Sequence, residues 1–209
     1  MLARATPFLP ILIREQKQFW GDHPKPTTLA AQVEQESLWN PNARLKTSRE
    51  EGVGFGQLTR AYRADGSIRF DVFSETKALD KSLKDWDWDN RFDPVFQLRA
   101  VIVKNKQLYA QVKGAKSNVD HLAFAYAAYN GGLGGVLSDR KLCAATPHCN
   151  PAIWFGNVQR TSLKAKSAVK GYGHSFFDIN REYVINILIT RREKYDTYYW
   201  GEKSETPIK

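Results

Sequence analysis

LAAQVEQESLWNPNARLKTSREEGVGFGQLT, residues 29–59, combines a short helical pattern, a polar segment and a glycine-rich turn. Just before it, Pro26 and the Thr27–Thr28 pair are typical of a helix start. Asn40 precedes Pro41, and the residue before a proline is disfavoured in helical geometry, so the helix is predicted to stop there. The stretch therefore predicts a helix, then a polar loop, then a tight turn.

Glu36 lies near the end of this predicted helix. Leu29, Val33 and Glu36 follow the i, i+4, i+7 rule, so the carboxyl group shares a stripe with two apolar residues. If this stripe packs, Glu36 loses solvent, and its pKa is expected to rise toward the range useful to a general acid. Glu34 is expected to face another side of the helix. The alternative for Glu36 is an ordinary solvated glutamate, as most helical glutamates are.

Composition favours one globular domain over residues 1–209, with an N-terminal helix and connector over 1–26 and a flexible tail over 201–209. The net charge of +9 implies an acidic partner, either nucleic acid or the anionic bacterial envelope. The Lys and Arg residues are scattered and no nucleic-acid motif is present, so nucleic acid is not expected as a partner. No apolar run has the length of a membrane span, so stable membrane insertion is not expected either.

Periodicity and turn residues predict a mainly helical chain with one small hairpin. The hairpin is predicted at Asp65–Gly66, and residues 133–173 form the least regular region. His23 begins the stiff connector His23-Pro24-Lys25-Pro26 and is expected to be a solvated turn residue. Helices are predicted over Pro10–Trp20, from Pro94 to about Val112, from Asn118 or Asp120 to Asn130 as a buried central helix, and from Asp178 to about Tyr198.

Cys143 and Cys149 are the only cysteines of the chain. An oxidising destination would allow a disulfide between them, whereas two free thiols are the alternative before release from the cytoplasm. His148 is the only nearby third ligand and the spacing is not a zinc pattern, so no metal site is predicted.

Three blocks in order carry a family resemblance. They are Glu-Ser-Leu-Trp-Asn-Pro-Asn-Ala from Glu36 with the later Gly-Phe-Gly-Gln, Ala-Ala-Tyr-Asn-Gly-Gly over 127–132, and Tyr183–Val184. Together they resemble the lytic transglycosylases of the soluble-lytic (SLT, lysozyme-like) superfamily, over roughly Leu29 to Leu188. The resemblance implies a mainly α, lysozyme-like helical fold with a small β-hairpin beside the cleft.

In such an enzyme, the resemblance implies, Glu36 first protonates the glycosidic oxygen between N-acetylmuramic acid and N-acetylglucosamine. The same carboxylate then takes the proton of the C6 hydroxyl, which closes a 1,6-anhydro ring. Peptidoglycan glycan strands are the implied partner, and neither a cofactor nor a metal is needed. The substrate-binding residues carried over by position are Ser48 (with Thr47 as its rival), Gln57, Tyr129, Asn130 and Tyr183. The chain departs from the family in having Gly56 where a Met usually precedes the glutamine.

Three alternatives stay open. A hydrolytic, goose-type-like muramidase needs a second carboxylate, for which the candidates are Glu50, Glu51, Asp65 and Asp71. A non-catalytic peptidoglycan-binding module needs none. A cationic membrane-active protein would use helical tail residues such as Arg191, Arg192 and Lys194. Two aromatic pairs, Trp86 with Trp88 and Trp154 with Phe155, suit either packing or sugar stacking.

The N-terminal segment has only a short apolar patch, broken by Pro10 and soon followed by charge, so it is not interpreted as a signal peptide. A wall enzyme of this kind is expected to be a bacteriophage product, an endolysin or a virion-associated lysin. It would be made in the cytoplasm and act in the periplasm or cell wall, after holin release or delivery by the virion. A processed protein, or a bacterial or prophage copy without a signal, is the remaining option.

Overall fold

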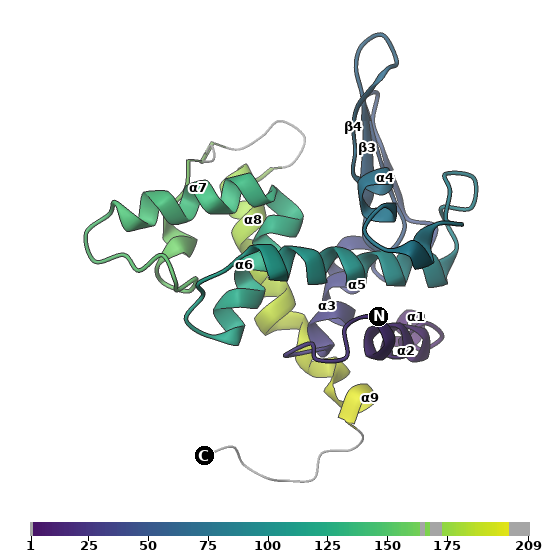
Figure 1. Cartoon of the computed structure of the whole chain (residues 1–209), viewed down its shortest axis with the longest axis horizontal. Coiled ribbons are helices and arrows are strands. Elements are labelled where there is room, and N and C mark those ends of the chain that lie inside the picture. Colours follow the sequence, from purple (N-terminus) through teal and green to yellow (C-terminus); the bar gives the residue numbers. More distant parts are fainter. Residues whose placement is uncertain (1, 164–165, 168–172, 201–209) are drawn as a thin grey trace. The chain divides into compact units, whose positions relative to one another are not determined.

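The computed structural model describes residues 2–163, 166–167 and 173–200; it is mainly helical with one small antiparallel sheet (Figure 1). This confirms the predicted mainly α class. The chain forms two compact units: the first comprises the described residues up to 104 and from 191 onward, and the second comprises those between 105 and 190. Because these units are clusters of contacts, the prediction of one domain over 1–209 stays a prediction. The tail predicted to be flexible, 201–209, lies outside the described residues.

The first unit contains short helices and the sheet. Its helical elements are α1 (Leu2–Ala5), α2 (Leu9–Phe19), α3 (Thr27–Ser37), α4 (Val72–Lys77), the 3-10 turn η1 (Lys81–Leu83), the start of α5 (Pro94–Gln111), the 3-10 segment η4 (Arg192–Tyr195) and α9 (Asp196–Trp200). Asp93 starts α5, where its carboxylate accepts hydrogen bonds from the backbone amides of Val95 and Phe96. The predicted first helix and the long helix from Pro94 are therefore confirmed.

Helix α3 starts at Thr27 as predicted but ends at Ser37, before Asn40. Leu38 and Trp39 both have left-handed backbone geometry, with φ of 52° and 61°, and the Leu38 amide donates to the Glu34 carbonyl. The predicted stop at Asn40 is therefore wrong. The chain leaves the helix two residues earlier through these two residues, before the restriction imposed by Pro41 acts.

The sheet is an antiparallel meander in the order β1 (Arg44–Lys46), β2 (Glu50–Val53), β3 (Leu58–Tyr62) and β4 (Ile68–Asp71). The hairpin predicted at Asp65–Gly66 is confirmed as the connection from β3 to β4, and Gly66 has a φ of 82°. The polar loop predicted before the glycine turn is instead the β1–β2 hairpin. The two strands are connected by ion pairs such as that from Arg44 to Glu51. Because they carry charged residues, they lack the alternating apolar pattern from which strands are predicted.

The second unit contains the rest of α5, α6 (Asn118–Gly131), α7 (Leu133–Ala144), the 3-10 turn η2 (Val158–Arg160), α8 (Phe176–Ile185) and most of the π-helical segment η3 (Asn186–Arg191). Residues 122–128 of α6 are all buried, which confirms the predicted central helix. The prediction that residues 133–173 are irregular is wrong for α7. Gly134 and Gly135 in its first turn lower helix propensity and conceal the pattern.

The final helical stretch is segmented. Ser175 caps α8, because its hydroxyl accepts the Asp178 amide at 3.0 Å and donates to the Asp178 carboxylate at 2.6 Å. Ser175 is therefore the N-cap residue, and the predicted start at Asp178 is wrong by about one turn. The single helix predicted to Tyr198 is instead α8 followed by η3, η4 and α9.

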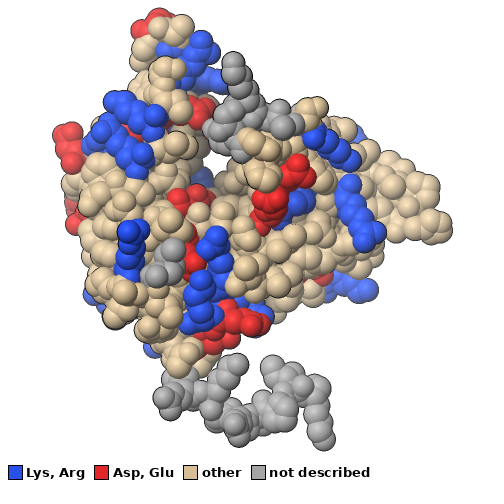
Figure 2. All heavy atoms as spheres, turned by 180° about the vertical axis from the view of Figure 1, so that it is seen from behind, with Lys and Arg blue, Asp and Glu red and all other residues tan. Residues whose placement is uncertain are grey.

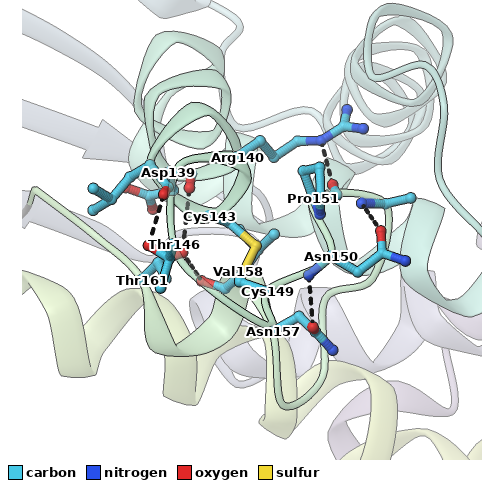
Figure 3. Close-up of a disulfide and its surroundings, with 12 residues drawn as sticks. Asp139, Arg140, Cys143, Thr146, Cys149, Asn150, Pro151, Asn157, Val158 and Thr161 are labelled. Carbon is cyan, nitrogen blue, oxygen red and sulfur yellow. Dashed lines mark hydrogen bonds between the residues drawn. A yellow bond between two sulfur atoms is a disulfide. The ribbon is translucent and has the colours of Figure 1, made fainter.

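A disulfide joins Cys143, at the end of α7, to Cys149 (Figure 3). The surrounding loop is fixed by side chains: Arg140 donates to the Pro151 carbonyl at 2.8 Å, and Asn157 accepts the Asn150 amide at 2.8 Å. The disulfide and these bonds give the region after α7 a defined path.

Several aromatic residues pack in the interior. Trp86 is buried against Phe73, and Trp154 against Phe124, so packing explains both. His23 is also buried, with its ring against Trp20 at 4.0 Å. The prediction of a solvated turn histidine is therefore wrong.

Within the described residues, none of the helices combines the length and the apolar character that crossing a membrane requires.

Candidate active site

Glu36 is the second-last residue of α3 and is half-buried. Leu29 and Val33, on the same helical stripe, are completely buried. The predicted stripe therefore packs as expected, and it ends at a carboxyl group that is partly withdrawn from water. The negative end of the helix dipole also lies at this terminus, where it disfavours a charged carboxylate.

Lys104 on α5 supplies a positive charge near this carboxyl group. Burial lowers the pKa of Lys104 to about 8, while the negative charges of Glu75 and Glu36 act in the opposite direction. Lys104 is therefore a partly desolvated cation that interacts electrostatically with the candidate acid. It was not predicted, because a single lysine in a helical pattern gives no signal of its neighbours.

Gln57 closes the glycine-rich turn, with a φ of 46°. Its side-chain amide donates to the carbonyls of Gly54 at 2.8 Å and Ala43 at 3.3 Å. Gly54 has a φ of 69°, and a Cβ at this position would overlap the side-chain amide of Gln97. Only glycine combines this backbone geometry with so close an approach.

Gln97 on α5 ties the turn to the segment after α3. Its Oε1 accepts the Phe55 amide at 2.7 Å, and its Nε2 donates to the Pro41 carbonyl at 2.9 Å. The Phe55 ring also packs edge-on against Trp39, with centroids 5.9 Å apart. The turn with Gln57 and the chain following Glu36 are therefore parts of one packed structure. Sequence reasoning missed Gln97, whose only signal was a polar residue beside the apolar stripe of α5.

Ser48 lies at the exposed tip of the β1–β2 hairpin. Its rival Thr47 accepts the amides of Arg49 and Glu50, at 3.2 and 3.0 Å, and so fixes the hairpin turn. The structure does not join either residue to Glu36, and the role of Ser48 stays a prediction.

The candidates for a second carboxylate are largely engaged in local structure. Glu51 is buried and pairs with Arg44 at 2.7 Å, and this hydrogen bond holds its pKa below the usual range. Asp71 caps α4 and pairs with Arg60 at 2.8 Å. Asp65 binds Ser67 within the hairpin turn, which lowers its pKa. Glu50 is half-buried on β2.

In the second unit, Asn130 and Tyr129 lie at the end of α6, and Tyr183 is buried on α8. The Asn180 amide donates to Asn130 Oδ1 and to the Ala127 carbonyl, both at 3.0 Å. Asn180 was not predicted. Its signal was the i, i+3 spacing from Tyr183, which puts the two residues on one helix face.

The charged side chains on one face of the protein are mixed in sign. On the face shown in Figure 2, Lys and Arg of the described residues are scattered and interspersed with Asp and Glu. The tail residues Arg191 and Lys194 both bind the carboxylate of Glu34, at 2.7 and 2.8 Å. Arg192 lies 3.4 Å from Glu193. These cations are therefore engaged by acidic groups and do not form a free cationic face.

The family model of the transglycosylase SLT domain matches residues 13–147. A membrane-bound lytic murein transglycosylase F of Pseudoalteromonas translucida (strain TAC 125) is 28% identical over 191 residues, covering 86% of this chain and 34% of the relative. The protein of the same name from Shewanella halifaxensis (strain HAW-EB4) is 31% identical over 176 residues, covering 82% of this chain and 31% of the relative. The chain thus spans about a third of the length of these curated relatives. The matched residues include Glu36, Gln57, Tyr129 and Asn130, and the match agrees with the mainly helical, lysozyme-like fold predicted above; the chain belongs to the transglycosylase SLT domain family.

Proposed function

We propose that the protein is a peptidoglycan lytic transglycosylase in which Glu36 is the catalytic acid and base. It cleaves the β-1,4 bond between N-acetylmuramic acid and N-acetylglucosamine and leaves a 1,6-anhydro end. The observation that carries the proposal is a half-buried carboxyl group at the end of α3, inside the family-matched residues and within the electrostatic reach of Lys104.

In the proposed reaction Glu36 acts twice, first as an acid and then as a base. Glu36 gives its proton to the glycosidic oxygen as the C1–O bond breaks, and the acetamido oxygen of the substrate stabilises the positive charge on C1. The Glu36 carboxylate then takes the proton of the C6 hydroxyl while the O6–C1 bond forms. Partial burial and the helix dipole favour the protonated acid before bond breaking. Lys104 favours the carboxylate that follows, since an opposite charge nearby stabilises it.

The other residues are proposed to bind and orient the sugar. Gln57 keeps its amide nitrogen on two backbone carbonyls, so its orientation is fixed before substrate arrives. Asn130 is oriented in the same way by Asn180. Tyr129 and Tyr183, which with Asn130 belong to the second unit, are also proposed to bind the glycan. Ser48 is the least constrained of these candidates, because it lies at an exposed hairpin tip.

Digestion of purified sacculi followed by mass spectrometry tests the proposal. We expect muropeptides lighter by one water than hydrolysis products, with ends that borohydride does not reduce. Glu36→Gln is expected to lower the rate about 10²- to 10⁴-fold. The matched control Glu193→Gln alters an exposed glutamate of η4 and should retain full activity.

Each alternative has its own outcome in this assay. Reducible ends would show a hydrolytic muramidase and contradict the transglycosylase proposal. Binding to sacculi without cleavage, unchanged in Glu36→Gln, would show a non-catalytic module. Lysis that persists in Glu36→Gln would show membrane damage independent of the acid.

We further propose that this enzyme serves as a phage endolysin or a virion-associated lysin. The net charge of +9 suits the anionic envelope, and the Cys143–Cys149 disulfide suits an oxidising compartment outside the cytoplasm. Expression in a Gram-negative host with and without a holin tests the endolysin form, and lysis is expected only with the holin. Export and lysis without a holin would contradict the endolysin role, and absence of the protein from purified virions would contradict the virion-associated role.

A further inference from the structure

Glu34 is the centre of a buried cluster two residues before the candidate acid. Its side chain is 2% exposed, and one carboxylate oxygen accepts both Arg191 Nη1 at 2.7 Å and Lys194 Nζ at 2.8 Å. The other oxygen accepts the hydroxyl of Tyr195. Arg191 also donates to Gln35 Oε1 at 2.9 Å. The segment 191–195, outside the family-matched residues 13–147, is thereby attached to α3.

Tyr195 connects Glu34 to Trp39, which follows the candidate acid in the chain. Its hydroxyl donates to Glu34 and accepts Trp39 Nε1 at 2.8 Å, so both hydrogen-bonding functions are used in a completely buried position. Burial and the adjacent Glu34 carboxylate raise the pKa of Tyr195. The hydroxyl therefore keeps its proton across the physiological range and remains a donor to Glu34.

Leu38 and Trp39 need such an anchor. Both have positive φ values, 52° and 61°, which cost free energy for residues other than glycine and persist only where the surroundings enforce them. Trp39 is 1% exposed and is held by Tyr195 and by the Phe55 ring. The last turn of a helix ordinarily frays. Here it is fixed at residue 34 on one side and at residue 39 on the other.

We infer that Glu34, Tyr195 and Trp39 form a positioning network that fixes the orientation of Glu36, which lies between the two anchored points. The inference rests on the proposed function. It makes the segment 191–195 a working part of the candidate active site, although no residue of that segment touches the reacting atoms in the proposed reaction.

The cluster also separates the charge states of the two glutamates. Glu34 is bound by two cations and a hydroxyl and stays ionised, and the excess positive charge lies at the helix C-terminus, where cations are favourable. Glu36 lies at the half-buried end of its stripe. One turn of helix thus carries a carboxylate for structure and a second one for proton transfer.

Tyr195→Phe tests the network, because it removes one hydroxyl and keeps the ring. We expect kcat on purified glycan strands to fall about tenfold while KM changes by less than about twofold, since a misplaced acid slows bond breaking and leaves sugar binding intact. Glu34→Gln should behave similarly. The double variant should lose no more than the larger single loss, because both changes break the same hydrogen bond. Tyr198→Phe, at an exposed tyrosine of α9, is the matched control and should retain wild-type kcat.

All variants are assayed well below their unfolding midpoints, with folding checked by circular dichroism. A purely structural role predicts a lower midpoint and unchanged kcat in the folded protein, and that result would overturn the inference. If Tyr195→Phe does not fold, Arg191→Met carries the test, because it removes one donor to Glu34 and keeps the Tyr195–Trp39 bond. A kcat unchanged in Arg191→Met would then overturn the inference.

The controls distinguish this inference from the proposed function. A wild-type protein that cleaves no glycan, or a Glu36→Gln variant as active as wild type, overturns both. An active wild type with an inactive Glu36→Gln and a fully active Tyr195→Phe overturns the positioning network alone.

Discussion

Glu34 in the first unit and Arg181 in the second are the centres of two buried polar clusters with opposite charge. Glu34 is an anion that accepts from Arg191, Lys194 and Tyr195. Arg181 is a cation that donates to the Asp139 carboxylate at 2.8 Å, to Asn180 Oδ1 at 2.8 Å and to backbone carbonyls, among them that of Thr161 at 2.8 Å. Each cluster is adjacent to a candidate site residue. Glu34 precedes Glu36 by two positions, and Arg181 binds Asn180, which in turn binds Asn130.

Because the two central groups titrate differently, the two clusters are expected to respond differently to pH. A guanidinium keeps its proton at every pH that proteins tolerate, whereas a carboxylate does not. Burial raises the pKa of Glu34, but the hydrogen bonds from Lys194, Tyr195 and Arg191 lower it further than burial raises it. A lowered pKa stabilises the fold above the unfolded value of 4.5, and this stabilisation is lost as the pH falls through the folded value. The Glu34 cluster is therefore expected to lose stabilisation in acid.

Arg181→Met should produce the largest effect on stability. It removes the guanidinium that binds the Asp139 carboxylate, which is 2% exposed, and breaking a buried ion pair costs about 3–5 kcal/mol. The loss in the free energy of unfolding, measured by urea titration, should be similar at pH 6 and pH 8. Arg160→Met, at an exposed arginine of η2, is the control and should change stability by less than about 0.5 kcal/mol. A loss as small as that of the control would show that the Arg181 cluster is not stabilising.

Replacing both cysteines by serine should produce the next largest effect. The disulfide closes a short loop, because Cys143 and Cys149 are six positions apart in sequence, at the end of the helix that carries Asp139. Loss of a loop of this size is expected to cost about 2 kcal/mol. The wild-type protein with reductant should match the double variant in thermal unfolding. No response to reductant would show that the disulfide does not stabilise the second unit.

His23 is a second group in the first unit whose protonation should lower stability in acid. Burial lowers its pKa from 6.5 to about 3, so the folded protein keeps it neutral where the unfolded chain binds a proton. Stability is therefore lost as the pH falls from 6.5 toward 3, by about 1.4 kcal/mol at pH 5.5. His23→Asn retains an acceptor for the Lys25 amide and should not show this loss. His148→Asn, at an exposed histidine with a φ of 60°, should keep it.

Compared with Arg181→Met, the double cysteine variant and His23→Asn, Glu34→Gln should produce the smallest change in stability, measured in acid. The reason is that burial and hydrogen bonding shift the pKa of Glu34 in opposite directions. In a His23→Asn background, stability should still fall as the pH drops below 4.5, and adding Glu34→Gln should flatten that slope. Unfolding midpoints measured between pH 5 and pH 3 check the difference. An equal slope in both proteins would show that Glu34 gains no net stabilisation from its ionised form.

Local patterns predicted much of this structure, and partners distant in sequence account for most of what was missed. The helix starts followed from Pro26 and Asp93, and the apolar spacing of α6 predicted its burial. The Glu34 cluster was missed because Arg191 lies 157 positions away, and a single sequence does not reveal such a pairing. Helix propensity failed for α7 because of its two early glycines. The strands β1 and β2 were missed because they are stabilised by charge pairs.

The close approach of Gln97 to Gly54 has a consequence for engineering. Since a side chain at position 54 would occupy the space of the Gln97 amide, neither position can be redesigned alone. Transplanting the turn with Gln57 from a relative, in order to change which glycan is accepted, would require the matching residue of α5 as well. The turn and the helix segment beneath it are best exchanged as one cassette.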